Sequence, residues 1–279
     1  MMVVSKLFCE MSPLTYKISV QKEILKRNCM NLLGGKSLAR TKSNQVLPIL
    51  VYSHSALIRR KLGNVDSRLQ ENKAVNLALA APKVDKILIK PGETFSFWSL
   101  VGRCSASQGY KEGLMISKGE PSSGIGGGMC QFTNLIHWMI LHSPLTITEH
   151  HHHGNLDLFP DYGRQIPFGT GTSIHYNYLD YRFINTTDNT FQLMIEVGEE
   201  KLKGQLRSLK PLSSTYHIEE RDAYFKEEAD GIYRYNKIYI RQFDKTTGNL
   251  LKEELIIENR AKVMYDKSYV ENRKEYIGL

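Results

Sequence analysis

Apolar residues recur at intervals of three and four over several stretches of the chain, and this spacing predicts helices. The clearest stretch covers residues 130–143 and is ended by Pro144. Its apolar positions, which share one side of a helix, are Phe132, Leu135, Ile136, Met139 and Ile140. The same spacing predicts a basic, amphipathic helix over residues 14–33 and another helix over residues 67–79.

Short apolar or alternating stretches bounded by turn residues predict strands. In the first half these lie at residues 47–52, 86–89, 94–97, 111–116 and 145–149. In the second half they lie at residues 173–185, 191–197, 201–207, 215–219, 233–243 and 250–258. The sequence therefore predicts an α+β protein, with a mixed N-terminal half and a mostly antiparallel sheet in the C-terminal half.

The same pattern divides the chain into three parts. We expect an N-terminal helical segment at residues 1–46, a core at residues 47–210 and a β extension at residues 211–279. The core would carry both the central helix and a histidine-rich strand end. The tail after Lys262 is polar, and we expect it to be loosely attached.

A glycine-rich turn runs directly into the central helix. It extends from Gly124 to Gly128, and Cys130 falls in the first turn of the helix, opposite the apolar side. Glycine accepts positive φ and lets a ligand approach the backbone, so Gly126, Gly127 and Gly128 are candidate substrate-binding positions. Free N–H groups and the helix dipole favour a thiolate at Cys130. The cysteine is either a nucleophile or a small filler at the start of a packing helix.

Four consecutive histidines follow the strand predicted at residues 145–149. In extended backbone, alternate side chains share a face, so His151 and His153 point one way and His150 and His152 the other. A strand that returns after the helix brings one pair toward Cys130, where an imidazole can act as a base.

Other polar residues complete a candidate acyl-transfer site. Either Glu149 or Asp157 can orient an imidazole, and the Gln131 side chain can contribute to an oxyanion hole. Glu93 and Ser96 lie beside a predicted turn, where they either hold a substrate or serve the turn itself.

Several segments resemble those of one known family. The run from Gly126 to Gln131, which reads GGGMCQ, resembles the signature of the VanW family, first named from glycopeptide-resistance gene clusters of bacteria. Residues 90–98, 149–154 and 159–169 agree with the same family in order and spacing. The resemblance covers roughly residues 47–255, and it favours His153 as the base, with His152 second.

The resemblance also implies an activity. Some VanW-like domains resemble cysteine-dependent L,D-transpeptidases, which join or trim peptidoglycan stem peptides through a thioester. Carried over, this implies that Cys130 attacks a carbonyl of the tetrapeptide stem and releases D-alanine. Those proteins work outside the cell, whereas this sequence shows no export signal. Unconventional export, action on cytoplasmic precursors and loss of the activity all remain open.

Two other classes of function fit the same residues. In the first, His151 and His153, with Cys130 or His175, hold Zn²⁺ and leave one coordination position open. In the second, the chain is a non-enzymatic accessory protein that binds a cell-wall peptide at the glycine turn and the histidines. The enzyme and the accessory protein share a site, but only the enzyme requires the sulfur of Cys130. No cofactor is expected unless the zinc alternative holds.

Composition adds a preference for anionic partners. The chain has 279 residues, 41% of them hydrophobic, with a formal net charge of +8. This favours a phosphate-bearing cell-wall precursor or a membrane surface, and no motif supports nucleic-acid binding. No apolar run reaches about 18 residues, so we expect a cytoplasmic protein. The basic helix at residues 14–33 either contacts an anionic membrane face or packs on the domain.

Overall fold

The computed structural model describes residues 7–35, 37–60, 66–117, 120–152, 155–161, 165–271 and 276–277. Its helices are η1 (Phe8–Glu10), α1 (Pro13–Leu33), α2 (Ser67–Val84), α3 (Phe97–Val101), η2 (Ala106–Gln108), α4 (Met129–Leu141) and η3 (Lys267–Tyr269). The strands of the first half are β1 (Ile49–Leu57), β2 (Ile87–Ile89), β3 (Thr94–Ser96), β4 (Glu112–Ser117), β5 (Glu120–Ile125), β6 (Thr146–Glu149) and β7 (Leu156–Asp157). Those of the second half are β8 (Arg182–Ile184), β9 (Phe191–Val197), β10 (Lys201–Ser208), β11 (Ser214–Glu228), β12 (Gly231–Asp244), β13 (Leu250–Val263) and β14 (Tyr276–Ile277).

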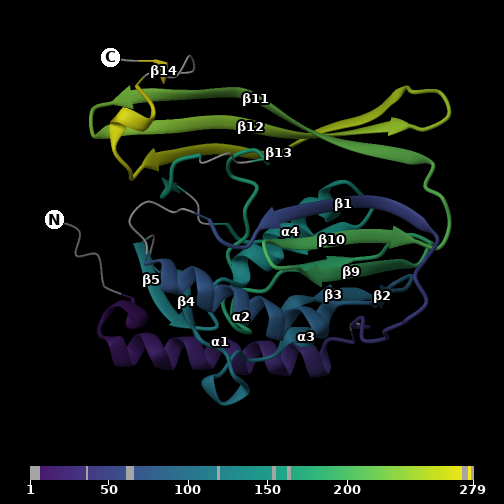
Figure 1. Cartoon of the computed structure of the whole chain (residues 1–279), viewed down its shortest axis with the longest axis horizontal. Helices are drawn as coiled ribbons and strands as arrows, with labels where there is room; N and C mark the ends of the chain where they lie inside the picture. The colour runs from purple at the N-terminus through teal and green to yellow at the C-terminus, as the bar shows by residue number, and fades with distance from the viewer. Residues whose placement is uncertain are drawn as a thin grey trace.

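The main body is a four-stranded antiparallel sheet in the order β1-β10-β9-β2, with α2 and α4 packed on it (Figure 1). In β10 the side chains alternate strictly, and Leu202 and Leu206 are fully buried against the helices. Gly204 lies between them, where a Cβ atom would stand 2.6 Å from Cε of Met139 in α4. The missing side chain lets the central helix pack directly against this strand.

A second sheet lies above the main body in the view of Figure 1, on the side of β1. The long strands β11, β12 and β13 form an antiparallel meander, and the short β14 and β7 extend it at the two edges through parallel pairing. Two smaller sheets, β3-β8-β6 and the hairpin β4-β5, complete the fold. The expected α+β class, with a largely antiparallel second half, is confirmed, whereas the three-part division of the chain stays a prediction.

Two expectations for the second half of the chain were not met in full. Of the strand predicted at residues 173–185, only Arg182–Ile184 forms, because His175 to Leu179 closes a turn through its own backbone hydrogen bonds. The tail after Lys262 is not wholly loose, since Val270 is fully buried against Phe225 and Ile232 of the second sheet.

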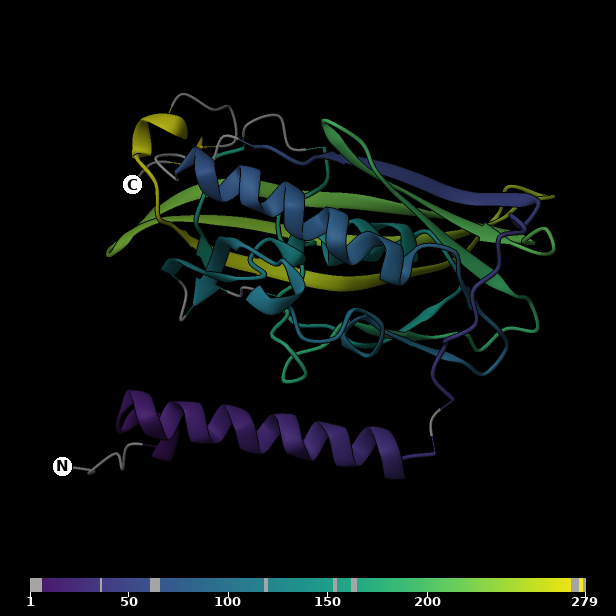
Figure 2. The ribbon, with the colours of Figure 1, turned by 60° about the horizontal axis from the view of Figure 1, so that its bottom comes forward.

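Helix α1 runs along the outside of the body and stands apart from it in a second view (Figure 2). Not one of its residues is buried. Ser12 caps its start by accepting the Thr15 N–H, and Pro13 occupies the first helical position. None of the helices among the described residues is long and apolar enough to cross a membrane.

Candidate functional site

The last three residues of the glycine turn before α4, Gly126 to Gly128, are each glycine for a different structural reason. Gly126 and Gly128 adopt φ values of 78° and 95°, in the left-handed region that favours glycine. Gly127 faces Gly113 of β4 so closely that a Cβ atom on it would lie 2.2 Å from the Gly113 carbonyl. The buried Asn76 side chain donates to the Gly127 carbonyl at 2.9 Å and fixes the turn to α2. The glycines therefore shape the turn, and Gly128 also lines a cavity.

Cys130 is the second residue of α4, so the expected position in the first turn is confirmed. Burial raises the pKa of its thiol, and hydrogen bonds from the backbone N–H groups of Ile174 and Cys130 itself offset this only in part. In the free protein the sulfur is therefore protonated at neutral pH, in contrast to the thiolate that its position at the helix start favoured. Desolvation outweighs the helix-start dipole here.

The cysteine borders a cavity of about 290 Å³ between α2, β1, β4 and α4. Its walls include Leu114 and Leu135 on the apolar side, and Lys73, Gln70 and Gln131 on the polar side. A second cavity of about 280 Å³ adjoins it and reaches toward β13. The two share lining residues, namely Arg60, Ile116, Asn134, Phe159 and Ile166. Together they offer an elongated site with mixed polarity, as an extended peptide requires.

Lys73 is the functional candidate that sequence analysis missed. It is only 5% exposed, and its Nζ donates to Oε1 of Gln70 at 2.7 Å. Burial, together with the charges of Arg60 and Arg59, lowers its pKa to about 7. Its aliphatic part crosses Gly128, where a Cβ atom would stand 2.3 Å from Lys73 Cγ. A buried amine that titrates near neutrality thus shares the cavity with Cys130.

A signal for Lys73 was present in the sequence. The buried side of α2 runs through Gln70, Lys73, Asn76, Leu77, Ala80, Ala81 and Val84, at helical spacing. A lysine in line with Leu77 and Ala80 occupies a core-facing position, and buried lysines are uncommon. Its inward position was therefore readable from periodicity, whereas its proximity to Cys130 depends on how α2 and α4 meet.

The histidines divide between two environments. The His150 ring stacks on His137 of α4 with ring centroids 4.3 Å apart, and its Nε2 lies 3.0 Å from the Gly171 carbonyl. His152 lines the second cavity, and burial lowers the pKa of both His150 and His152. His151 turns the other way, with Nε2 3.2 Å from Glu149. His153 and Gly154, which carried the strongest expectation for the base, lie outside the described residues.

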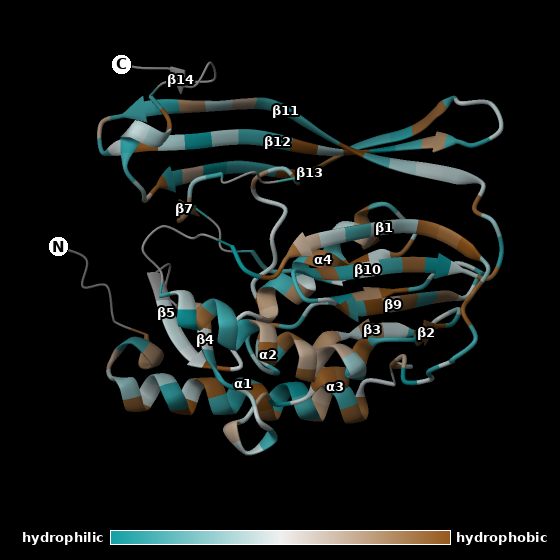
Figure 3. Cartoon of the chain, viewed as in Figure 1, coloured by the Kyte–Doolittle hydropathy of each residue, from teal (hydrophilic) through white to brown (hydrophobic). Residues whose placement is uncertain are grey.

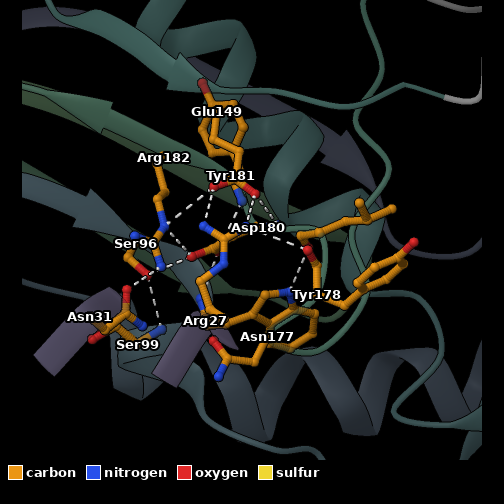
Figure 4. A network of polar contacts seen from close by, with 12 residues as sticks. Arg27, Asn31, Ser96, Ser99, Glu149, Asn177, Tyr178, Asp180, Tyr181 and Arg182 are labelled. Atoms are coloured by element: carbon orange, nitrogen blue, oxygen red, sulfur yellow. Dashed lines mark hydrogen bonds and ion pairs between the residues drawn. The ribbon is translucent and has the colours of Figure 1, made fainter. Parts of the chain in front are cut away.

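Glu149 belongs to a polar network on the side of the body that faces α1 (Figure 4). Arg27 of α1 binds both of its carboxylate oxygens, at 2.5 and 2.7 Å, and the Asp180 N–H donates to it at 2.9 Å. Arg182 lies 3.6 Å from Glu149 and donates to the Asp180 carboxylate at 2.7 Å. Glu149 thus anchors α1 and lines neither cavity beside Cys130.

The remaining predicted site residues have local partners. Ser96 is buried, donates to Asp180 at 2.6 Å and caps α3. Glu93 accepts the Lys90 N–H within its own turn. Gln131 lines the cavity, but its Nε2 already donates to the Leu57 carbonyl at 2.7 Å. Of the candidates named from the sequence, the structure places Cys130, Gln131 and Gly128 around one cavity.

The zinc hypothesis stays a prediction, because one of its ligands, His153, lies outside the described residues. Among the residues that the structure describes, no group of three or more His, Cys, Asp or Glu side chains is arranged to hold a metal ion. His151 points to Glu149, away from the cavity of Cys130. The cavity beside Cys130 is lined mainly by amide, cationic and apolar side chains, with one imidazole, that of His54.

Fold and site together define an α+β protein with a peptide-sized cleft, in which a half-buried cysteine at a helix start shares the cleft with a buried amine. The family model described as VanW like protein matches residues 72–207. The chain is 35% identical over 231 residues to the Vancomycin B-type resistance protein VanW of Enterococcus faecalis, which covers 83% of this chain and 84% of that protein. The chain therefore belongs to the VanW family.

A second relative matches a smaller part. The uncharacterized protein YoaR of Bacillus subtilis is 30% identical over 118 residues, which is 41% of this chain and 36% of that protein. No solved structure shows a significant match to the chain.

Proposed function

We propose that this protein acts in bacterial cell-wall metabolism, as a thiol-dependent acyltransferase on a peptidoglycan stem peptide. The name of the enterococcal relative associates that protein with vancomycin resistance, and membership of the same family supports a cell-wall role here. The observation that carries the chemistry is that Cys130 and Lys73 border one cavity. A nucleophile and an amine with a pKa near 7 are the two groups that thioester formation needs.

In the proposed reaction, the neutral Nζ of Lys73 accepts the thiol proton as the sulfur of Cys130 attacks a peptide carbonyl carbon. N–H groups at the start of α4 stabilise the developing oxyanion. The C–N bond then breaks, the ammonium of Lys73 returns its proton to the leaving amine of D-alanine, and a thioester remains on Cys130. Water, or the amine of a second stem peptide, attacks the thioester, loses a proton and restores the thiol. No external oxidant or reductant is needed.

The resting pair is a thiol and an amine. Because the pKa of Lys73 is about 7 and burial raises that of Cys130 above its ordinary value, complete proton transfer in the free protein is unfavourable. Proton transfer is therefore expected together with attack on a bound substrate. The rate should therefore depend mainly on how the bound peptide is positioned in the cleft.

The raised pKa of Cys130 also favours a second candidate, a protein that binds the stem peptide without reacting with it. The walls of the two cavities supply apolar contacts, amides and the cation of Arg60, which are the groups that recognise an anionic peptide. The two candidates share a site and differ in whether the sulfur reacts.

Intact-mass spectrometry with synthetic tetrapeptide and pentapeptide stems separates the two. For the acyltransferase we expect an acyl adduct on the wild-type chain that is absent in Cys130→Ser and strongly reduced in Lys73→Met. Cys29→Ser and Lys252→Met, which alter exposed residues, serve as matched controls and should retain the adduct.

Peptide binding by calorimetry completes the test. Equal binding by wild type and Cys130→Ser, with no adduct and no released D-alanine, establishes the binding protein. Absence of both binding and adduct contradicts both candidates.

A further inference from the structure

Helix α1 contacts the body through its polar side. Arg27 and Asn31 reach Glu149 and Arg182, and Asn28 accepts a hydrogen bond from Asn177 at 2.5 Å. A helix of this length in a folded protein normally owes its stability to an apolar side that packs on the core. In α1 that arrangement is inverted, and none of its residues is buried.

Val20 and Ile24 of α1 are half-buried, but most of its apolar residues are exposed, and four of them lie on the side away from the body. Leu14, Ile18, Leu25 and Leu32 are 66%, 49%, 65% and 83% exposed. At about 100° per residue they fall within about 40° of one another, which makes one straight stripe along the helix. We call these four residues the outer stripe. Figure 3 shows brown, hydrophobic segments that alternate with teal, hydrophilic ones along α1.

Lysines flank the outer stripe. Lys17 lies on one side of it, Lys22 and Lys26 lie on the other, and all three are exposed. The acidic residue within α1 is Glu23, which is 3.9 Å from Lys26. The stripe is therefore bordered by positive charge on both sides, and the ammonium groups can extend outward while their methylene stems lie along it. Leu7, Phe8 and Met11 expose further apolar surface just before the helix.

We propose that the outer stripe of α1 docks on a membrane surface that carries anionic phospholipid headgroups. An exposed leucine stripe between lysines is the arrangement by which a helix lies in the interface, with its leucines in the acyl boundary and its lysines at the headgroup phosphates. The net charge of +8 adds long-range attraction to such a surface. The polar contacts through Arg27 and Asn31 would then hold the body against the bilayer.

The charges argue against a second copy of this chain as the occupant. A symmetric pair of α1 helices would bring the lysines beside one stripe close to those beside the other, with one glutamate in each helix to offset them. Like charges along both edges oppose helix pairing, whereas an anionic bilayer neutralises them. The inference does not depend on any reaction at Cys130, which lies on a different part of the molecule.

Flotation of the full chain with vesicles tests the proposal. We expect co-flotation with phosphatidylcholine vesicles containing about one quarter phosphatidylglycerol, and much less with phosphatidylcholine alone. Raising the salt concentration should weaken the binding. The double variant Leu25→Ser/Leu32→Ser, and separately Lys17→Gln/Lys22→Gln, should each reduce the bound fraction at least about tenfold.

A matched control uses leucines of similar exposure elsewhere. Leu250 and Leu251 of β13 are 46% and 55% exposed, and Leu250→Ser/Leu251→Ser should leave flotation unchanged. Because the stripe residues are exposed, circular dichroism should show all variants folded. Flotation that the stripe variants do not change would overturn the proposal. So would a stripe-dependent dimer in sedimentation together with no binding to anionic vesicles.

Discussion

Helices α1 and α4 look alike in sequence and differ in how the fold uses them. Both show apolar residues at helical spacing, but ten of the thirteen residues of α4 are buried while none of the twenty-one in α1 is. In α4 the apolar side faces the sheet, and in α1 an arginine and asparagines face the body instead. Periodicity thus predicts that a helix forms, but charge placement decides which side meets the protein.

The largest expected effect follows from α4. Phe132→Ala removes a ring that is fully buried and packs against Phe97 with centroids 5.5 Å apart. We expect the free energy of unfolding to fall by about 3–5 kcal/mol, because the site leaves a cavity that the sheet cannot fill. Urea denaturation measures this. A loss below about 1 kcal/mol would show that α4 is not the centre of the core.

A smaller effect is expected where α1 meets the body. Arg27→Met removes the bidentate contact to Glu149, and we expect docking of α1 to weaken by about 1–2 kcal/mol, since the pair is only partly exposed. Hydrogen exchange should accelerate in α1 and stay constant in α4. Lys26→Met, one residue earlier and exposed, is the matched control and should change neither helix.

Each helix also carries a cysteine, so the reactivity of the two thiols can be compared directly. Cys29 of α1 is exposed, whereas burial raises the pKa of Cys130 in α4. At about pH 8 we expect iodoacetamide to label Cys29 at least about tenfold faster than Cys130, as followed by mass spectrometry. Faster labelling of Cys130 would mean that its thiolate is more accessible and more stable than this cavity allows.

The contact between α1 and the body should also depend on pH. Burial alone raises the pKa of Glu149, but hydrogen bonds from Arg27, the Asp180 N–H and His151 together hold it below its ordinary value. A carboxylate with a depressed pKa stabilises docking above about pH 4.3, and its contribution is lost as the pH falls through the lower folded value. Amide chemical shifts of Tyr178 and Asp180 report this. The same titration in Glu149→Gln should be flat.

The smallest expected effect concerns the outer stripe. Leu25→Ser should change the free energy of unfolding by no more than about 0.5 kcal/mol, because its side chain is exposed on the face away from the body. Thermal denaturation measures the change. A loss above about 1 kcal/mol would mean that this face packs on the protein in solution, and the contrast between the two helices would then disappear.

Local patterns predicted the elements well and their assembly less well. The helix over 130–143 and the strands over 191–197 and 201–207 form almost as expected, because their apolar periodicity is also their packing face. The strand expected over 173–185 failed because its middle closes a turn held by its own backbone. That turn depends on the position of the chain after α4, which no short pattern encodes.

The site shows the same limit. Cys130 was predicted at the start of a helix because glycines and periodicity mark that position. The role of Glu149 as the anchor of α1 could not be read from sequence, since its partner Arg27 is 122 residues away. The raised pKa of Cys130 was missed for a related reason, because the burial that raises it depends on segments that the fold brings around the start of α4.

The contact of Lys73 with Gly128 has an evolutionary consequence. A side chain at position 128 would occupy the space that the stem of this lysine fills, so the two positions are not free to change separately. Among relatives, a glycine at the position of 128 should accompany a long residue at the position of 73. A relative with a larger residue at the first should carry both a short residue at the second and a rearranged turn, because φ at Gly128 is 95°. Gly128 would then be retained in the family partly because the stem of Lys73 needs the space beside it.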